Sequence, residues 1–173
     1  MKKNLIAAAI AATTIMSAAS ALAADGTVNF TGEITPNPCI VDIGTNNTMT
    51  VDLGRVGVTA FTGPGSKASA TKFILKLKDC PADMTARFKF DGTPYDGDDS
   101  VLKLTQQNGV AKGVAIELSD TGAVLPLFTA STAYSLVAGV ENEVPFYARY
   151  IQKAATVEAG VANATSTFTV NYN

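Results

Sequence analysis

The strongest constraint on the fold is a period-two alternation of apolar and polar residues, which recurs in short segments along most of the chain. Successive side chains of a β-strand point to opposite faces of a sheet, so this alternation predicts half-buried strands. Gly, Asp and Pro separate the segments, and β-branched or aromatic residues fill many alternating positions. Only residues 153–162 admit a helical turn. We therefore expect an all-β sandwich. Its predicted strands lie in residues 28–34, 49–53, 73–77, 86–90, 102–104, 114–118, 124–128, 144–150 and 168–172.

The N-terminus has the features of a secretory signal. Lys2 and Lys3 precede an apolar run from Leu5 to Met16, and Ala21-Leu22-Ala23 supplies the small residues of a cleavage site. The run is shorter than the roughly 20 residues that a membrane-spanning helix needs. We interpret residues 1–23 as a cleaved signal peptide, with a retained N-terminal anchor as the alternative. Removing 23 of 173 residues leaves 150, the size of one domain.

The composition excludes several kinds of chemistry. The chain contains no His and no Trp, so Ser-His-Asp and Cys-His relays and His-containing zinc sites are excluded. Two Cys are too few for a zinc site made only of thiolates. We therefore expect neither a cofactor nor a metal. The acidic net charge and the scattered Lys and Arg argue against nucleic acid as a partner.

Cys39 and Cys80 both lie in the exported part of the chain. An even number of cysteines in an oxidising compartment normally pairs, so we expect a structural disulfide. Such a bond closes a loop of about 40 residues, for which the chain-entropy model gives roughly 4 kcal/mol of stabilisation.

Three patterns could suggest catalysis or metal binding, and each is weak. Ser69 and Lys72 match the S-x-x-K pattern of serine acyl-enzymes, but the companion motifs are absent. We expect Lys72 to point outward from its strand. The acidic turn at residues 91–99 lacks the spacing of an EF-hand calcium loop. A pair of carboxylates for glycoside hydrolysis is not excluded, although no particular pair stands out.

The two ends of the exported chain carry the most information. Residues 27–34 form a strand-like segment before Cys39, and residues 168–172 form another at the C-terminus. Terminal strands commonly close a sandwich within one chain, which is the simplest explanation. Phe146 and Tyr150 are expected on one face of another strand.

The sequence from Gly26 to Asn173 resembles the type 1 pilins, the major subunits of chaperone-usher fimbriae. Gly160, fourteenth from the C-terminus, and the penultimate Tyr172 are the most specific marks. The other segments that carry the resemblance are residues 26–34 before Cys39, 50–54, 79–80, 113–120, 146–150 and 168–173.

The resemblance implies an immunoglobulin-like β-sandwich that lacks its final strand and is completed by a strand donated by another copy. It implies a donor strand in a 24–38 extension, with Val28, Phe30, Gly32 and Ile34 facing the groove. It also implies a pilin domain over 39–173. The acceptor groove and chaperone-recognition residues are then Gly160, Phe168, Val170 and Tyr172. The implied partners are other pilins of the fibre, a periplasmic chaperone and an outer-membrane usher.

The proposed donor segment has the properties that strand donation requires. It is free of Pro, it is apolar on one face, and Pro36 and Pro38 follow where pairing should stop. Burying each of Val28, Phe30 and Ile34 would contribute roughly 1.5–3 kcal/mol. Gly32 interrupts the apolar row and suggests a close approach to the acceptor.

We therefore predict a non-enzymatic shaft subunit of a surface fimbria, exported through the periplasm and supporting cell adhesion. A minor adaptor or terminator pilin is the alternative within the family. A secreted, monomeric, glycan-binding β-sandwich is an alternative from another class. Insertion of the chain's own N-terminal segment into its groove also stays open.

Overall fold

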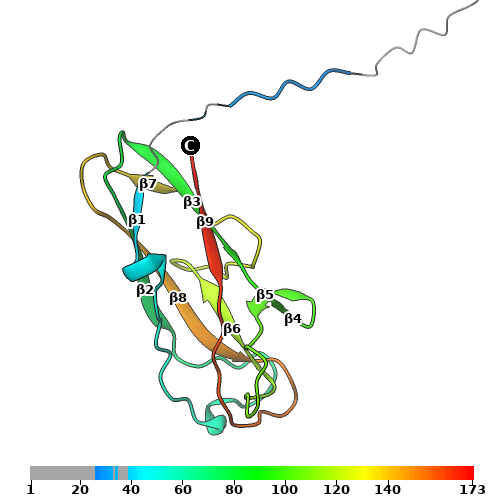
Figure 1. Cartoon of the computed structure of the whole chain (residues 1–173). Coiled ribbons are helices and arrows are strands. Elements are labelled where there is room, and N and C mark those ends of the chain that lie inside the picture. The colour runs from blue at the N-terminus through cyan, green and yellow to red at the C-terminus, as the bar shows by residue number, and fades with distance from the viewer. Residues whose placement is uncertain (1–25, 33, 35–38) are drawn as a thin grey trace, which may run out of the picture. The chain divides into compact units, whose positions relative to one another are not determined.

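The computed structural model describes residues 26–32, 34 and 39–173 (Figure 1). The chain divides into two units, 1–34 and 35–173. In the first unit, the described residues belong to no strand or helix. The predicted signal peptide, Pro36 and Pro38 lie outside the described residues.

The second unit is all-β, as predicted, with nine strands and two 3-10 helices among its described residues. Its elements are β1 (Ile40–Asp42), η1 (Thr45–Asn47), η2 (Val58–Ala60), β2 (Thr71–Lys78), β3 (Met84–Asp91), β4 (Pro94–Tyr95), β5 (Asp98–Leu102), β6 (Val114–Ser119), β7 (Tyr134–Leu136), β8 (Asn142–Gln152) and β9 (Thr167–Tyr172). No described helix is both long and apolar enough to cross a membrane.

The strands form two antiparallel sheets. One has the order β1-β2-β8-β6-β5-β4 and the other the order β7-β3-β9. The core lies between them, where the ring of Phe88 on β3 meets that of Phe146 on β8 at 5.3 Å between centroids. Phe73 and Phe90 complete this cluster around Phe146. Such edge-to-face and offset contacts add to the free energy gained from burial alone.

Period-two alternation identified five strands correctly. Four of them are more buried on one face than on the other, whereas every residue of β6 is buried. Residues 73–77, 86–90, 114–118, 144–150 and 168–172 lie in β2, β3, β6, β8 and β9. The β4–β5 hairpin arises from Asp96-Gly97, whose φ angles of 49° and 87° suit a tight turn in which both central residues have positive φ.

Three sequence predictions were wrong. Residues 49–53 keep an alternating burial but belong to no strand, because no described strand pairs with them. Residues 124–128 form a loop in which Phe128 has a φ of 63°, which interrupts an extended conformation. Residues 153–162 contain no helix, because their backbone pairs with another loop at Lys112–Glu158 and Val110–Val161. Strands β1, β4 and β7 were not predicted, and the strand predicted at residues 102–104 overlaps β5 only at Leu102.

Candidate strand-acceptor groove

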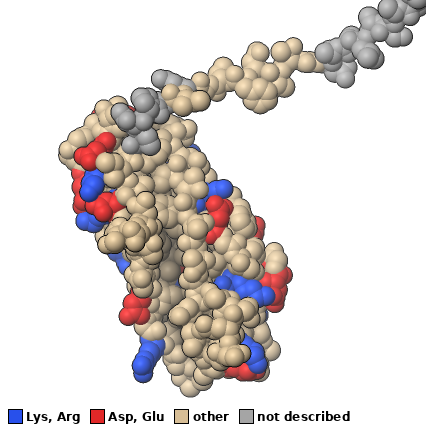
Figure 2. All heavy atoms as spheres, viewed as in Figure 1, with Lys and Arg blue, Asp and Glu red and all other residues tan. Residues whose placement is uncertain are grey.

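A long groove of about 1040 Å³ lies between the edges of the two sheets. On one side it is bordered by β9 and the preceding residues 162–166, and on the other by β1 and residues 47–53. Its floor comes from core residues such as Phe73, Leu75 and Phe90. No lining residue is charged. Figure 2 shows the hollow between uncharged atoms, with charged side chains towards the flanks.

Strand β9 presents an apolar row to this groove. Phe168, Val170 and Tyr172 are half-buried and line it, whereas Thr169 and Asn171 between them are exposed. β9 pairs with β3 along one side only, and no described strand pairs with its other side. An unpaired edge with an apolar row beside it can accept another strand.

The edge continues beyond β9 towards the N-terminus. Ala162, Ala164 and Ser166 alternate in burial with exposed neighbours and line the same groove. The hydroxyl of Tyr150 donates a hydrogen bond of 2.8 Å to the carbonyl of Ala162, and burial raises the pKa of this tyrosine. Residues 162–172 therefore form an extended border of roughly 35 Å, at about 3.3 Å per residue.

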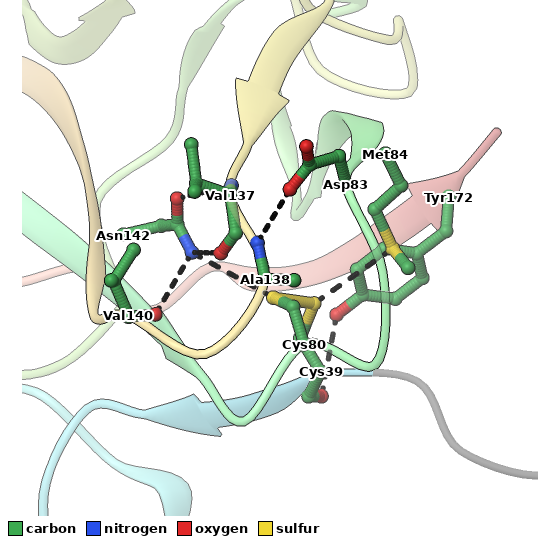
Figure 3. The surroundings of a disulfide bond; sticks show 9 residues. All are labelled: Cys39, Cys80, Asp83, Met84, Val137, Ala138, Val140, Asn142 and Tyr172. Carbon is green, nitrogen blue, oxygen red and sulfur yellow. Dashed lines mark hydrogen bonds between the residues drawn. A yellow bond between two sulfur atoms is a disulfide. The ribbon is translucent and has the colours of Figure 1, made fainter.

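The opposite border is held by the disulfide between Cys39 and Cys80 (Figure 3). This bond was predicted from the even cysteine count, and it joins the start of β1 to the residues that follow β2. The Tyr172 hydroxyl approaches the Cys39 carbonyl at 3.5 Å, so the two borders come close at this end of the groove. Burial raises the pKa of Tyr172.

Gly160 lies outside the groove, although the sequence interpretation placed it there. It precedes the border by two residues and packs against the backbone of residues 109–111. A Cβ atom at this position would lie 2.5 Å from Ala111 N and 2.7 Å from Val110 C. Only a glycine fits there, so Gly160 positions the groove border instead of lining the groove.

The border formed by residues 47–53 was missed as part of the site. The sequence could have indicated this border, because Met49, Val51 and Leu53 alternate with polar residues. These three side chains are partly buried against the core and line the groove.

The proposed donor residues expose their apolar side chains. Val28 is 75% exposed, Phe30 is 93% exposed and Ile34 is 99% exposed. Gly32 is exposed as well, and a Cβ added there would meet no atom within 4 Å.

The other sequence candidates do not line the groove. Ser69 is exposed, and Lys72 points outward from β2 as predicted. In the acidic turn, Asp96 pairs with Lys103 and Asp98 with Lys153, at 2.8 Å and 2.6 Å. Among the described residues, no three acidic or Cys side chains form a group that could hold a metal ion.

Comparison with known proteins assigns the chain to a family. The family model described as "Fimbrial protein" matches residues 28–173. The chain belongs to the fimbrial protein family. It is similar to the probable major fimbrial subunit LpfA of Escherichia coli O157:H7, with 32% identity over 99% of this chain and 97% of the relative.

Two solved structures are similar to this fimbrial protein. An antigen and type I fimbria protein of Burkholderia pseudomallei is 38% identical, with a TM-score of 0.61 over 85% of this chain and 97% of that chain. The P pilus rod subunit PapA is 19% identical and has a TM-score of 0.65 over 79% of this chain and all of that chain. The fold is therefore the immunoglobulin-like sandwich of pilins, which lacks a strand.

This membership gives the general function. The chain is a structural subunit of a fimbria. Its relatives are exported subunits that polymerise with other pilins into surface fibres.

Proposed function

We propose that this fimbrial subunit forms the shaft of its fibre by strand donation between identical copies. Residues 26–34 of one copy would add a strand along β9 of the next. Strand addition of this kind is an established mode of peptide recognition. The observation that carries the proposal is the uncharged groove between two sheet edges, one of which is the unpaired edge of β9.

The exposed donor side chains supply the driving force. Burying Val28, Phe30 and Ile34 would contribute roughly 1.5–3 kcal/mol each, or about 5–9 kcal/mol together. Each ladder hydrogen bond would add about 1 kcal/mol net. A strand of eight residues needs about 26 Å, which fits the border at 162–172. The product should dissociate very slowly.

The chain is divided accordingly in this proposal. Residues 1–23 are removed, residues 24–38 form the extension that carries the donor strand, and residues 39–173 form the pilin domain. A periplasmic chaperone would cover the groove before assembly, and an outer-membrane usher would pass the subunit to the cell surface, where the fibre supports adhesion. The subunit has no enzymatic role.

The direct test is deletion of residues 27–34 followed by electron microscopy. We expect the shortened subunit to fold but to form no fibres. Adding a synthetic peptide of residues 26–34 should fill its groove and raise its melting temperature without producing polymer. Fibres of normal length from the deletion variant would disprove strand donation.

Copy number separates the shaft from the adaptor role. In purified fibres this chain should be the most abundant subunit by quantitative mass spectrometry. A stoichiometry of one copy per fibre would instead identify an adaptor or terminator.

A further inference from the structure

A second, smaller pocket of about 320 Å³ lies on the opposite face of the six-stranded sheet from the groove. Leu118 and Ala148 line the groove, whereas their neighbours Ser119, Tyr147 and Arg149 line this pocket. Successive side chains alternate between faces, so β6 and β8 serve both sites without sharing a residue. A ligand here would leave the groove unobstructed.

Two cross-strand pairs lie at the pocket, and all their residues except Glu117 line it. Glu117 lies opposite Arg149 and Ser119 lies opposite Tyr147 in the β6–β8 ladder. The Glu117 side chain is only 4% exposed, and its carboxylate contacts Lys67 Nζ at 2.7 Å and Arg149 Nε at 3.1 Å. Burial of a carboxylate is costly even when it is paired, so this ion cluster is weak evidence for stability. It holds two cationic side chains at the edge of the pocket.

The pocket offers hydrogen-bonding groups that the described part of the protein does not saturate. Ser119 is only 6% exposed, and neither its hydroxyl nor that of Tyr147 forms a hydrogen bond within the described residues. Asp120 is 7% exposed and accepts hydrogen bonds from Ala123 N at 3.4 Å and Thr132 Oγ1 at 3.2 Å. Hydroxyl and carboxylate groups that line a pocket can exchange hydrogen bonds with a polar ligand, so these groups are suited to one.

The charges of the lining define the kind of ligand. Two cations, Lys67 and Arg149, line the pocket together with one carboxylate, that of Asp120. Both cations also form ion pairs with a second carboxylate, that of Glu117, which does not line the pocket. A balanced site gives no net attraction to an ion, which favours a neutral ligand rich in hydroxyl groups. The Tyr147 ring adds one apolar surface beside them. The volume is at the small end for ligand pockets, which suits one sugar ring.

We propose that this pocket binds a neutral, hexose-sized unit of a glycan. Asp120 accepts hydrogen bonds from sugar hydroxyls, Ser119 and Arg149 donate to sugar oxygens, and the Tyr147 ring packs against the C–H face of the sugar. A site of this size binds with a dissociation constant on the order of 1 mM. If the subunit repeats along a shaft, as proposed above, many weak sites act together and raise the avidity.

The test uses saturation-transfer NMR on the purified mature protein with D-galactose, D-mannose and N-acetyl-D-glucosamine as neutral probes and N-acetylneuraminic acid as the anionic comparison. We expect saturation transfer to at least one of the neutral sugars. Ser119→Ala removes one hydrogen bond and Tyr147→Ala removes the ring that packs against the sugar, so each should weaken binding about tenfold. Lys76→Gln is the matched control, since Lys76 forms its ion pairs with Glu141 and Glu143 outside the pocket.

Two results would overturn the proposal. One is the absence of saturation transfer to any neutral sugar, including the case in which only N-acetylneuraminic acid binds. The other is binding that both pocket variants leave unchanged. Neither substitution touches the groove, so fibre formation should be normal in both variants, and a failure of this proposal leaves strand donation unaffected.

Discussion

The contact of Gly160 with residues 109–111 gives a quantitative prediction for Gly160→Ala. The added Cβ would overlap backbone atoms alone, so no side chain can rotate to relieve the clash. The φ of Gly160 lies outside the left-handed region, so the cost comes from space and not from backbone conformation. The two segments must separate, which breaks the bonds from Val161 N to Gly109 O at 2.8 Å and from Ala111 N to Val161 O at 2.9 Å.

Losing these two hydrogen bonds costs about 2 kcal/mol, and some overpacking will remain. Ala restricts the unfolded chain more than Gly does, and this effect offsets about 0.5 kcal/mol of the lost stability. We therefore expect Gly160→Ala to lower the free energy of unfolding by about 2 kcal/mol. In urea this shifts the midpoint by roughly 1 M for an m-value of about 2 kcal/mol/M.

The assay is equilibrium unfolding in urea of the donor-deleted subunit complemented with the peptide of residues 26–34. Gly122→Ala is the matched control, because a Cβ there would meet no atom within 4 Å. We expect it to stay within about 0.5 kcal/mol of the wild type. If Gly160→Ala is equally neutral, the close packing that we assign to Gly160 is wrong.

Three further predictions follow from the structure. Replacing Cys39 and Cys80 together by Ser should cost about 4 kcal/mol in urea unfolding, and a loss under 1 kcal/mol would contradict a structural role. Hydrogen bonds from Lys153 and Ser100 lower the pKa of Asp98 from 3.8 to about 2. The stabilisation that ionised Asp98 contributes is therefore complete above about pH 4 and is lost as the pH falls towards 2. The melting temperature of Lys153→Met should consequently fall less between pH 4 and pH 2 than that of the wild type. Phe168→Ala should weaken binding of the donor peptide at least tenfold in a fluorescence titration, because Phe168 lines the groove beside Phe90, and unchanged affinity would argue against its place in the site.

Sequence patterns predicted the strands that bury one face. β8 is an example, because Val144, Phe146 and Ala148 alternate with less buried neighbours and are all core residues. The same pattern failed at residues 49–53, where the side chains alternate in burial but the backbone belongs to no strand. Alternation reports which face of a segment is buried, whereas strand pairing also needs a neighbour, and the neighbour comes from elsewhere in the chain.

The candidate site also combines features that the sequence predicts with features that only the fold determines. The apolar row of β9 could be predicted from Phe168, Val170 and Tyr172 alone, because it is a local alternation. The facing border could not be predicted, since the packing of the two sheets decides that residues 47–53 lie across from β9. The position of Gly160 depends in the same way on a loop about 50 residues earlier in the chain.

The sequence by itself determined the local properties of this protein: the strand period, the two cysteines, the uncharged C-terminal row and the apolar N-terminal segment. The tertiary structure alone decided which sheet edges stay unpaired, where the groove closes, and that Lys67, Glu117 and Arg149 meet on the outer face. The physical reason is the separation along the sequence over which each property acts. Alternation and residue chemistry act between neighbours in sequence, whereas unpaired edges and ion clusters result from contacts between segments that only the packed fold brings together.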